Sequence, residues 1–366
     1  MRAAILEAIG KPLVIADDVE IALPGPGQVR VAVSHCGICH SDLSVVNGSF
    51  PAETPIVLGH EATGVVDSIG AGVTKLAPGD PVVLTPCPPC GTCYWCVRNE
   101  PGCCANSMAL FSNRHLDGST GLSRAGETVL RGLGVAAFAE YVVTSENGAV
   151  RIPEDVPRDV ACVIGCAVQT GVGAVLNTAG VEAGATVLVM GLGGIGLSIV
   201  QGARVAGAAR IVVSDPLAAR REAATELGAT DLLDPTENDV AAAAHELTDG
   251  IGVDYAFESV GSARICEVGI AACRSGGTIV AVGAAPLAEE IHIAPAALFT
   301  ASEKKLVGCL LGSSNSLREI PRLIALWQSG RLDLAALITH RRPLAEINEA
   351  MDDLAAGRGI RTVLEI

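Results

Sequence analysis

The sequence predicts an α/β protein in which a doubly wound parallel sheet is joined to a smaller, mostly antiparallel β domain. A chain of 366 residues is too long for one compact core and suits two domains. Half of it is apolar (49%) and only 3% is aromatic, which suits a parallel sheet covered by helices on both faces. The spacing of strand-like runs also changes near Gln169, which places the domain boundary there.

Short strands and tight turns dominate the first third of the chain. Residues 28–33 alternate Val with Gln, Arg and Ala, the period of a half-buried strand. Pro-Gly turns at 24–27 and 77–80 separate such runs. Further β-type runs follow at 63–66, 81–84 and 141–143. This pattern predicts a small, mostly antiparallel barrel.

From Gln169 onward, strand-like and helix-like runs alternate, which predicts a doubly wound parallel sheet. The strands are expected at 186–190, 211–214, 253–257, 278–282 and 306–311, and the helices at 195–206, 217–227 and 240–247. The tail adds helices at 317–328 and 344–356 and a strand at 362–364. These changes of pattern divide the chain into 1–168, 169–312 and 313–366.

Composition excludes some classes of partner. A formal charge of −15 argues against nucleic acid, which needs clustered Lys and Arg. Residues 1–7 lack the apolar run of a signal peptide. The uncharged stretch 183–203 is interrupted by six glycines, so it fits a strand, a turn and a helix better than a membrane span. We expect a cytoplasmic protein whose thirteen cysteines stay reduced, so that clustered ones are metal ligands.

A glycine-rich turn indicates a dinucleotide site. The expected strand Thr186–Met190 leads directly into GLGGIG at 191–196, which opens a helix. Asp215 ends the next strand, 19 residues past Gly196, where a carboxylate can hold ribose hydroxyls. The turn would place a pyrophosphate at the helix N-terminus, as in a Rossmann domain. Asp215 would repel a 2′-phosphate, so NAD is favoured over NADP, although Arg220 and Arg221 could soften that preference. The alternative is a glycine-rich packing turn.

A four-cysteine loop indicates a structural zinc. Cys90, Cys93 and Cys96 repeat at CxxCxxC spacing and Cys104 follows. Four thiolates can close a tetrahedron with no position left for substrate. Cys103 competes as the fourth ligand and Cys87 is an outside contender. The alternatives are free surface thiols, or a zinc ribbon that contacts nucleic acid, for which the acidic chain offers no basic surface.

A second candidate set of metal ligands is dispersed along the chain: Cys39, His60 and Cys166. Taken alone, each is also explained as a buried thiol or a turn histidine. Four further motifs occur along the chain: GICHSD at 37–42, GHE at 59–61, GC at 165–166 and IRT at 360–362. Their order, taken together with the four-cysteine loop and the glycine turn, resembles that of the zinc-containing medium-chain alcohol dehydrogenases. The likeness runs end to end. It is closest to the branch of liver-type, glutathione-dependent formaldehyde, aryl-alcohol and nicotinoprotein dehydrogenases.

The resemblance implies a GroES-like catalytic domain made of 1–168 and 313–366 with two zincs, and a Rossmann NAD-binding domain made of 169–312. It also implies reversible oxidation of a primary alcohol to an aldehyde. Cys39, His60 and Cys166 would bind the catalytic zinc and leave one position open. Asp42 would orient His60, and Glu61 would approach the metal transiently. Ser41 would carry the alcohol's proton. The cofactor would contact His40, Thr170, Gly191, Leu192, Gly193, Gly194, Ile195, Gly196, Asp215, Arg220, Val260, Val282 and Arg361.

Several positions depart from the liver-type pattern. Ser44 stands where a relay histidine is common, and His40 where an arginine often contacts the pyrophosphate. The resemblance places Ser41, Pro86, Gly132 and Leu133 at the substrate channel, where small residues would leave room for aromatic or medium-chain alcohols.

Two other enzyme readings stay open. One is a formaldehyde dehydrogenase acting on a thiol adduct, with Arg114 and Arg124 as candidate anion contacts. The other is a nicotinoprotein, which residues 308–315 resemble. Relatives form dimers or tetramers by pairing edge strands, so we also expect a homodimer or homotetramer, with 306–311 at the interface.

Overall fold

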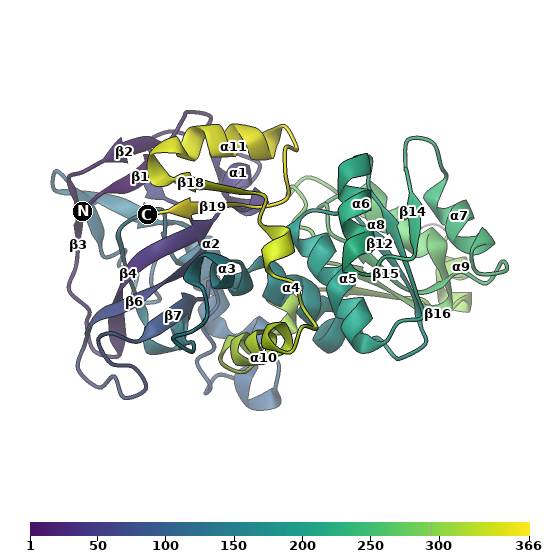
Figure 1. Cartoon of the computed structure of the whole chain (residues 1–366), viewed down its shortest axis with the longest axis horizontal. Helices are drawn as coiled ribbons and strands as arrows, with labels where there is room; N and C mark the ends of the chain where they lie inside the picture. Colours follow the sequence, from purple (N-terminus) through teal and green to yellow (C-terminus); the bar gives the residue numbers. More distant parts are fainter. Residues whose placement is uncertain (294) are drawn as a thin grey trace. The chain divides into compact units, whose positions relative to one another are not determined.

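The computed structural model describes residues 1–293 and 295–366, which form two compact units (Figure 1). The first unit contains Met1–Gln169, Asn315–Trp327 and Leu334–Ile366, and the second contains Thr170–Ser314 and Gln328–Asp333. The main boundaries fall within two residues of the sequence-based ones.

The segment Gln328–Asp333 differs from the expectation, because it packs with the second unit and not with the first. The side chain of Gln201 donates to the Asp333 carbonyl at 3.1 Å and accepts from the Asp333 N–H at 2.6 Å. Arg204 donates to the Arg331 carbonyl at 2.9 Å. These long-range bonds hold the segment to the second unit, and nothing in the local sequence signals them.

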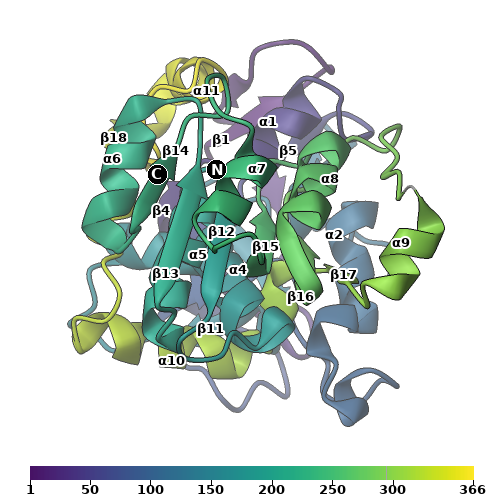
Figure 2. The ribbon, with the colours of Figure 1, turned by 90° about the vertical axis from the view of Figure 1, so that its right-hand side faces the viewer.

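The second unit is built on a six-stranded sheet in the order β14-β13-β12-β15-β16-β17, with every pair parallel (Figure 2). This is the strand order of a dinucleotide-binding fold. Its strands are β12 (Thr186–Met190), β13 (Arg210–Ser214), β14 (Asp231–Leu233), β15 (Val253–Glu258), β16 (Cys273–Ala281) and β17 (Lys305–Gly308). Its helices are α5 (Gly194–Ala206), α6 (Ala218–Leu227), α7 (Val240–Glu246), α8 (Ala263–Ala272) and α9 (Ala296–Ala301).

Several features of the second unit, helix α9 among them, were not anticipated. Strand β14 has only three residues, too few to show a period. Helix α8 contains Ile, Val, Cys and Gly, which carry little helical signal, and tertiary packing sets its structure. The strand expected at 306–311 ends at Gly308, because Leu311 and Ser313 adopt positive φ angles in a 3₁₀ turn.

The first unit contains two sheets whose strands are mostly antiparallel, as predicted. One sheet has the order β2-β1-β5-β9-β8-β3 and the other β11-β7-β6-β4-β19-β18, with β10 also on β4. The strands are β1 (Ala3–Leu6), β2 (Val14–Ala16), β3 (Val19–Ile21), β4 (Gln28–Gly37), β5 (Ile56–Val57), β6 (Glu61–Ile69), β7 (Pro81–Leu84), β8 (Leu122–Arg124), β9 (Glu127–Arg131), β10 (Tyr141–Ser145), β11 (Ala149–Arg151), β18 (His340–Pro343) and β19 (Thr362–Glu365).

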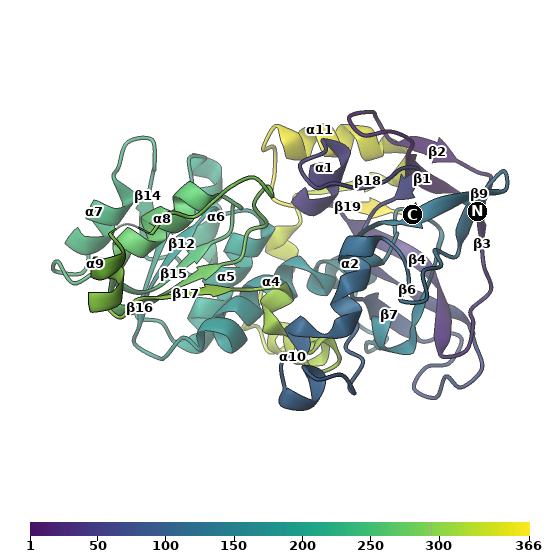
Figure 3. The ribbon, with the colours of Figure 1, turned by 180° about the vertical axis from the view of Figure 1, so that it is seen from behind.

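The first unit also contains several helices. They are α1 (His40–Val46), α2 (Met108–Ser112), α3 (Arg158–Ala161), α10 (Ser316–Gln328) and α11 (Ile347–Ala355), while α4 (Ala167–Gly173) spans the boundary between the units. Helix α11 lies beside β18, β19 and α1 (Figures 1 and 3). The segment 344–356, which was expected to be one helix, begins as a 3₁₀ turn, Leu344–Glu346, and continues as α11.

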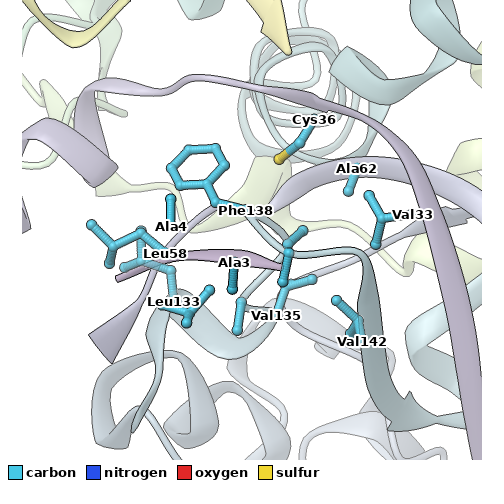
Figure 4. Packing of buried hydrophobic residues seen from close by; sticks show 14 of the residues in the cluster. Ala3, Ala4, Val33, Cys36, Leu58, Ala62, Leu133, Val135, Phe138 and Val142 are labelled. Carbon is cyan, nitrogen blue, oxygen red and sulfur yellow. The ribbon is translucent and has the colours of Figure 1, made fainter. Parts of the chain in front are cut away.

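A shared apolar core holds the two sheets of the first unit together. It includes residues from β1, β4, β6 and the segment 133–139. Figure 4 shows Leu133 in this cluster together with Leu58, Val135 and Phe138. Among the described residues no single helix is long and apolar enough to cross a membrane; one bent pair, 158–165 with 167–179, passes that test on length and composition.

Candidate metal centres and dinucleotide site

Four potential ligands from separate parts of the first unit converge on one point. Cys39 caps the N-terminus of α1 just after β4, and His60 follows the turn at Gly59, whose φ is +89°. Glu61 starts β6, and Cys166 lies at the break before α4. Their ligand atoms all lie within 4.8 Å of one another. The fold therefore assembles the dispersed set that spacing alone could not connect.

Asp42 holds the His60 ring and the backbone at Cys39 and Gly59 in place. It is fully buried, and its Oδ1 lies 3.2 Å from His60 Nδ1 and accepts from the Gly59 N–H at 3.0 Å. Its Oδ2 accepts from the Cys39 N–H at 3.0 Å. Because Nδ1 is engaged, Nε2 is the nitrogen left for a metal.

The charges in the cluster suit a divalent cation. The hydrogen bond from Cys166, followed by His60 and Arg361, holds the pKa of Cys39 well below its usual value despite its burial. Burial raises the pKa of Glu61 to about 7, against the opposing effect of Arg361. Neither Glu61 oxygen has a hydrogen-bond partner among the described residues. Thiolate, imidazole and carboxylate donors of this kind fit zinc.

Arg361, which the resemblance implies contacts the cofactor pyrophosphate, is partnered within the first unit. It is only 4% exposed, and it donates from Nη1 to the Ile38 carbonyl at 2.6 Å. Its Nε lies 3.5 Å from Glu61 Oε2. The pairing of β19 with the end of β4 carries Arg361 inward, where it balances the carboxylate beside the metal cluster.

Cys90, Cys93, Cys96 and Cys104 form the second cluster, again with sulfur atoms within 4.8 Å of one another. The Cys90–Cys96 and Cys93–Cys104 sulfur distances are both 3.9 Å. Four Zn–S bonds of about 2.3 Å give a tetrahedral edge of about 3.8 Å, so the cluster fits zinc without rearrangement. N–H groups of Ala105 and Cys96 lower the pKa of Cys93 to about 6. Among the described cysteines, exposed Cys103 and buried Cys87 lie outside both clusters, which decides between the candidate ligands.

The glycines of the turn after β12 have distinct physical roles. Gly191 has a φ of +88°, a conformation that side chains disfavour. A Cβ on Gly196 would lie 1.9 Å from the Gly191 carbonyl oxygen, so only glycine permits this close approach. At Gly193 a Cβ would meet nothing within 4 Å, which leaves backbone open to a ligand. Gly194 begins α5, so the turn presents that helix's N-terminus to a pyrophosphate.

Asp215 follows β13 beside this turn and is 3% exposed. Its Oδ2 accepts from the Leu192 N–H at 2.8 Å and its Oδ1 from the Leu217 N–H at 2.9 Å. Arg220 Nη1 lies 3.9 Å from Oδ2. The other residues implied to contact a cofactor lie as follows in their own units: exposed His40 on α1, buried Thr170 on α4, half-buried Ile195 on α5, exposed Val260 after β15 and buried Val282 after β16.

Two residues that support this turn were missed by the sequence reasoning. Ser259 donates to the carbonyls of Met190 and Gly191 at 3.0 and 2.9 Å. Glu258 accepts from the N–H groups of Val260 and Gly261, both at 2.7 Å. Their position at the carboxyl end of a strand next to β12 was the available signal, because ligands bind at that edge of such sheets.

The predicted channel residues Pro86, Gly132 and Leu133 lie buried in the first unit. A Cβ on Gly132 would lie 2.5 Å from the Val57 carbonyl oxygen, so glycine permits close packing against β5. Leu133 is 8% exposed and belongs to the apolar core, and Pro86 is also buried. Ser41 Oγ lies 3.8 Å from Cys39 Sγ, beside the metal cluster.

The candidate anion contacts for a thiol adduct already have partners. Arg114 lies 3.5 Å from Glu53, and Arg124 lies 3.0 Å from Glu7 and 2.8 Å from Asp18. Both arginines therefore have acidic partners within the chain.

Comparison with known proteins shows which family the chain belongs to. Residues 25–154 match the alcohol dehydrogenase GroES-like domain and residues 194–326 match the zinc-binding dehydrogenase domain. An alcohol dehydrogenase zinc-binding domain protein from Burkholderia ambifaria is 36% identical, with a TM-score of 0.94, over 100% of this chain and 98% of its own. The chain belongs to the zinc-binding medium-chain alcohol dehydrogenase family.

Other members of this family show the same likeness. Benzyl alcohol dehydrogenase from Acinetobacter calcoaceticus is 32% identical, with a TM-score of 0.94, over 100% of this chain and 99% of its own. A putative zinc-binding dehydrogenase from Sinorhizobium meliloti, bound to NADP, is 29% identical, with a TM-score of 0.81, over 100% and 99%. The predicted fold class, a GroES-like domain with a Rossmann-like domain, is confirmed.

Replacing Asp42 tests whether this residue supports zinc binding at the Cys39, His60 and Cys166 cluster. We expect Asp42→Asn to weaken binding of one zinc about 10- to 100-fold, because the amide cannot balance the imidazole and orient it as the carboxylate does. Competition with a chelator measures this. The four-cysteine site in the same sample is an internal control, and exposed Asp117→Asn is a matched one. Equal zinc retention in both variants would contradict the role assigned to Asp42.

Proposed function

We propose that this chain is a zinc-dependent alcohol dehydrogenase that reversibly oxidises primary alcohols, aromatic or medium-chain, to aldehydes with hydride transfer to NAD. The observation that carries the proposal is the cluster of Cys39, His60 and Cys166 beside the carboxylate of Glu61, with no fourth cysteine or histidine among the described residues. Closed structural sites use four such ligands, whereas catalytic sites keep a position for substrate. The four-cysteine cluster in the same chain supplies that contrast.

Cys39, His60 and Cys166 would hold zinc, which would supply a Lewis acid for an alcohol or aldehyde oxygen, and the glycine turn would hold NAD as the hydride acceptor. Asp42 keeps the His60 ring in one orientation and tautomer, and Arg361 balances Glu61. The Ser41 hydroxyl, close to Cys39, relays the proton: it accepts the proton of the alcohol hydroxyl as it donates its own. Ser44 has no basic nitrogen, so we expect water to accept the proton that Ser41 donates.

Asp215 is proposed to select NAD over NADP. Its carboxylate would bind two ribose hydroxyls and repel a 2′-phosphate. We expect Asp215→Asn to shift the ratio of kcat/KM for NADP over NAD by about tenfold or more, since each ~1.4 kcal/mol is a factor of ten. Asparagine keeps an oxygen for the Leu192 N–H, and Arg220 can then face the phosphate.

Steady-state kinetics with both cofactors measure the shift. Asp234→Asn is the matched control, because Asp234 follows the neighbouring strand and pairs with Arg221 at 2.9 Å. A preference that changes equally in both variants would place cofactor selection elsewhere.

The aromatic-alcohol proposal is supported by the likeness to benzyl alcohol dehydrogenase. The test combines zinc and nucleotide analysis of anaerobically purified protein with NAD reduction on benzyl alcohol and on ethanol. Two zincs per chain with turnover on benzyl alcohol agree with the proposal. A strong preference for ethanol would exclude the aromatic assignment. NAD that stays bound through gel filtration would instead indicate a nicotinoprotein.

A further inference from the structure

A buried arginine in the first unit has no counter-charge among the described residues, and it belongs to neither metal cluster. Arg131 ends β9 and is 4% exposed. Its Nε is buried and has no hydrogen-bond partner among the described residues. The same residues include no carboxylate within ion-pair distance of its guanidinium. Burying an unpaired charge is costly, so most buried arginines are paired.

Arg361 offers a comparison within the same unit. It is equally buried, at 4% exposure, yet it has Glu61 and the Ile38 carbonyl as partners. Its pKa is raised, because Glu61, Cys39 and Cys166 outweigh the effect of burial. Burial alone lowers the pKa of Arg131 to about 10. The chain has 40 acidic residues, and none of those described pairs with Arg131. The described residues therefore leave the positive charge of Arg131 without a counter-charge.

Arg131 lines a small cavity that opens to solvent and has room for about one water-sized group. Thr120 and Tyr141 are its other polar side chains, and the Thr120 hydroxyl already bonds Leu122. The rest of the lining is glycine or apolar, namely Ile21, Gly121, Leu122, Val135, Ala136, Val142 and Val143. An ion in this lining gives up most of its water, which favours a weakly hydrated, singly charged anion over phosphate or sulfate.

A second basic group lies close by. A Cβ built on Gly121, which lines the cavity, would be 3.8 Å from His115 Nε2. Burial and then Arg131 lower the pKa of His115 to about 4. His115 is therefore neutral near pH 7, and its ring can donate one hydrogen bond without adding charge.

We propose that Arg131, with His115 nearby, forms a binding site for one small monovalent anion such as chloride. The guanidinium is well suited to this role, because it is always charged and more weakly hydrated than an ammonium group. A bound anion replaces the carboxylate that the fold does not provide. A water molecule in the cavity would satisfy an N–H group but leave the charge uncompensated, so it is the competing occupant.

The test measures thermal unfolding of the zinc-loaded full chain as sodium chloride replaces sodium gluconate at constant ionic strength. Constant ionic strength holds screening of surface charges fixed. At a tenfold excess of chloride over its Kd, the folded-to-unfolded ratio of the wild type should rise about 11-fold. Arg131→Met should show no such rise, and in gluconate it should be at least as stable as the wild type.

Arg124→Met is the matched control, because Arg124 lies on the surface with two carboxylate partners. It should respond to chloride as the wild type does. Bromide-soaked crystals of the wild type give a readout that does not depend on the variant folding: an anomalous peak is expected beside the Arg131 guanidinium. An ordered water there, or an equal chloride response in wild type and Arg131→Met, would overturn the proposal.

Discussion

Replacing Cys166 by serine is expected to remove one of two zincs and to lower kcat/KM on benzyl alcohol by on the order of 10³-fold or more. A Lewis acid contributes several kcal/mol to the transition state, and each ~1.4 kcal/mol is a factor of ten. Cys166 is the ligand that the break before α4 brings to Cys39 and His60. A serine hydroxyl is a much poorer zinc ligand than a thiolate. Metal analysis and steady-state kinetics on the same preparation measure both effects.

Cys162→Ala is the matched control for this variant. Cys162 is buried in the turn just before Cys166, yet it lies outside both clusters. We expect it to keep both zincs and most of the activity. A Cys166→Ser protein that retained two zincs and wild-type turnover would mean that the three-ligand cluster is not the catalytic centre.

Cys104→Ser is expected to act on stability. Structural zinc contributes about 10 kcal/mol or more of apparent binding energy to isolated zinc modules. Even a loss of about 4 kcal/mol would lower the thermal midpoint by on the order of 10 °C. The loop around this cluster exposes Tyr94 and Val97, at 64% and 69%, so it has little core of its own to replace the metal. Calorimetry with zinc analysis measures the change.

Cys103→Ser separates the loss of a ligand from the loss of a thiol. Cys103 is the sequence neighbour of Cys104, but it is exposed and lies outside the cluster. We expect this variant to keep the wild-type midpoint and both zincs. If both serine variants unfolded alike, the loop would depend on something other than zinc.

Local patterns in the sequence were enough to predict the glycine turn and the four-cysteine cluster. Both lie within a few turns of chain, so their spacing fixes their geometry. Cys39, His60 and Cys166 are far apart in sequence, and only the resemblance joined them before the fold did. Helix α8 and strand β14 gave no periodic signal, because packing decides their structure.

Long-range packing also sets surroundings that the sequence does not show. The Val57 carbonyl near Gly132 shows that its missing side chain permits a close approach of the backbone. Arg361 carries no sign in the sequence that it turns inward to Glu61. The lack of an acid near Arg131 likewise becomes visible only when every neighbour is in place.

The pairing of β19 with β4 joins the end of the chain to the backbone just before Cys39. Leu364 pairs with Cys36, Val363 with Gly37, and the Ile38 N–H donates to the Thr362 carbonyl at 3.0 Å. The backbone just before Cys39 is therefore completed by residues made more than 300 positions later. The four-cysteine cluster, by contrast, draws all its ligands from residues 90–104. Synthesis of the last strand is therefore needed to complete the backbone beside Cys39, but not to supply any ligand of the four-cysteine cluster.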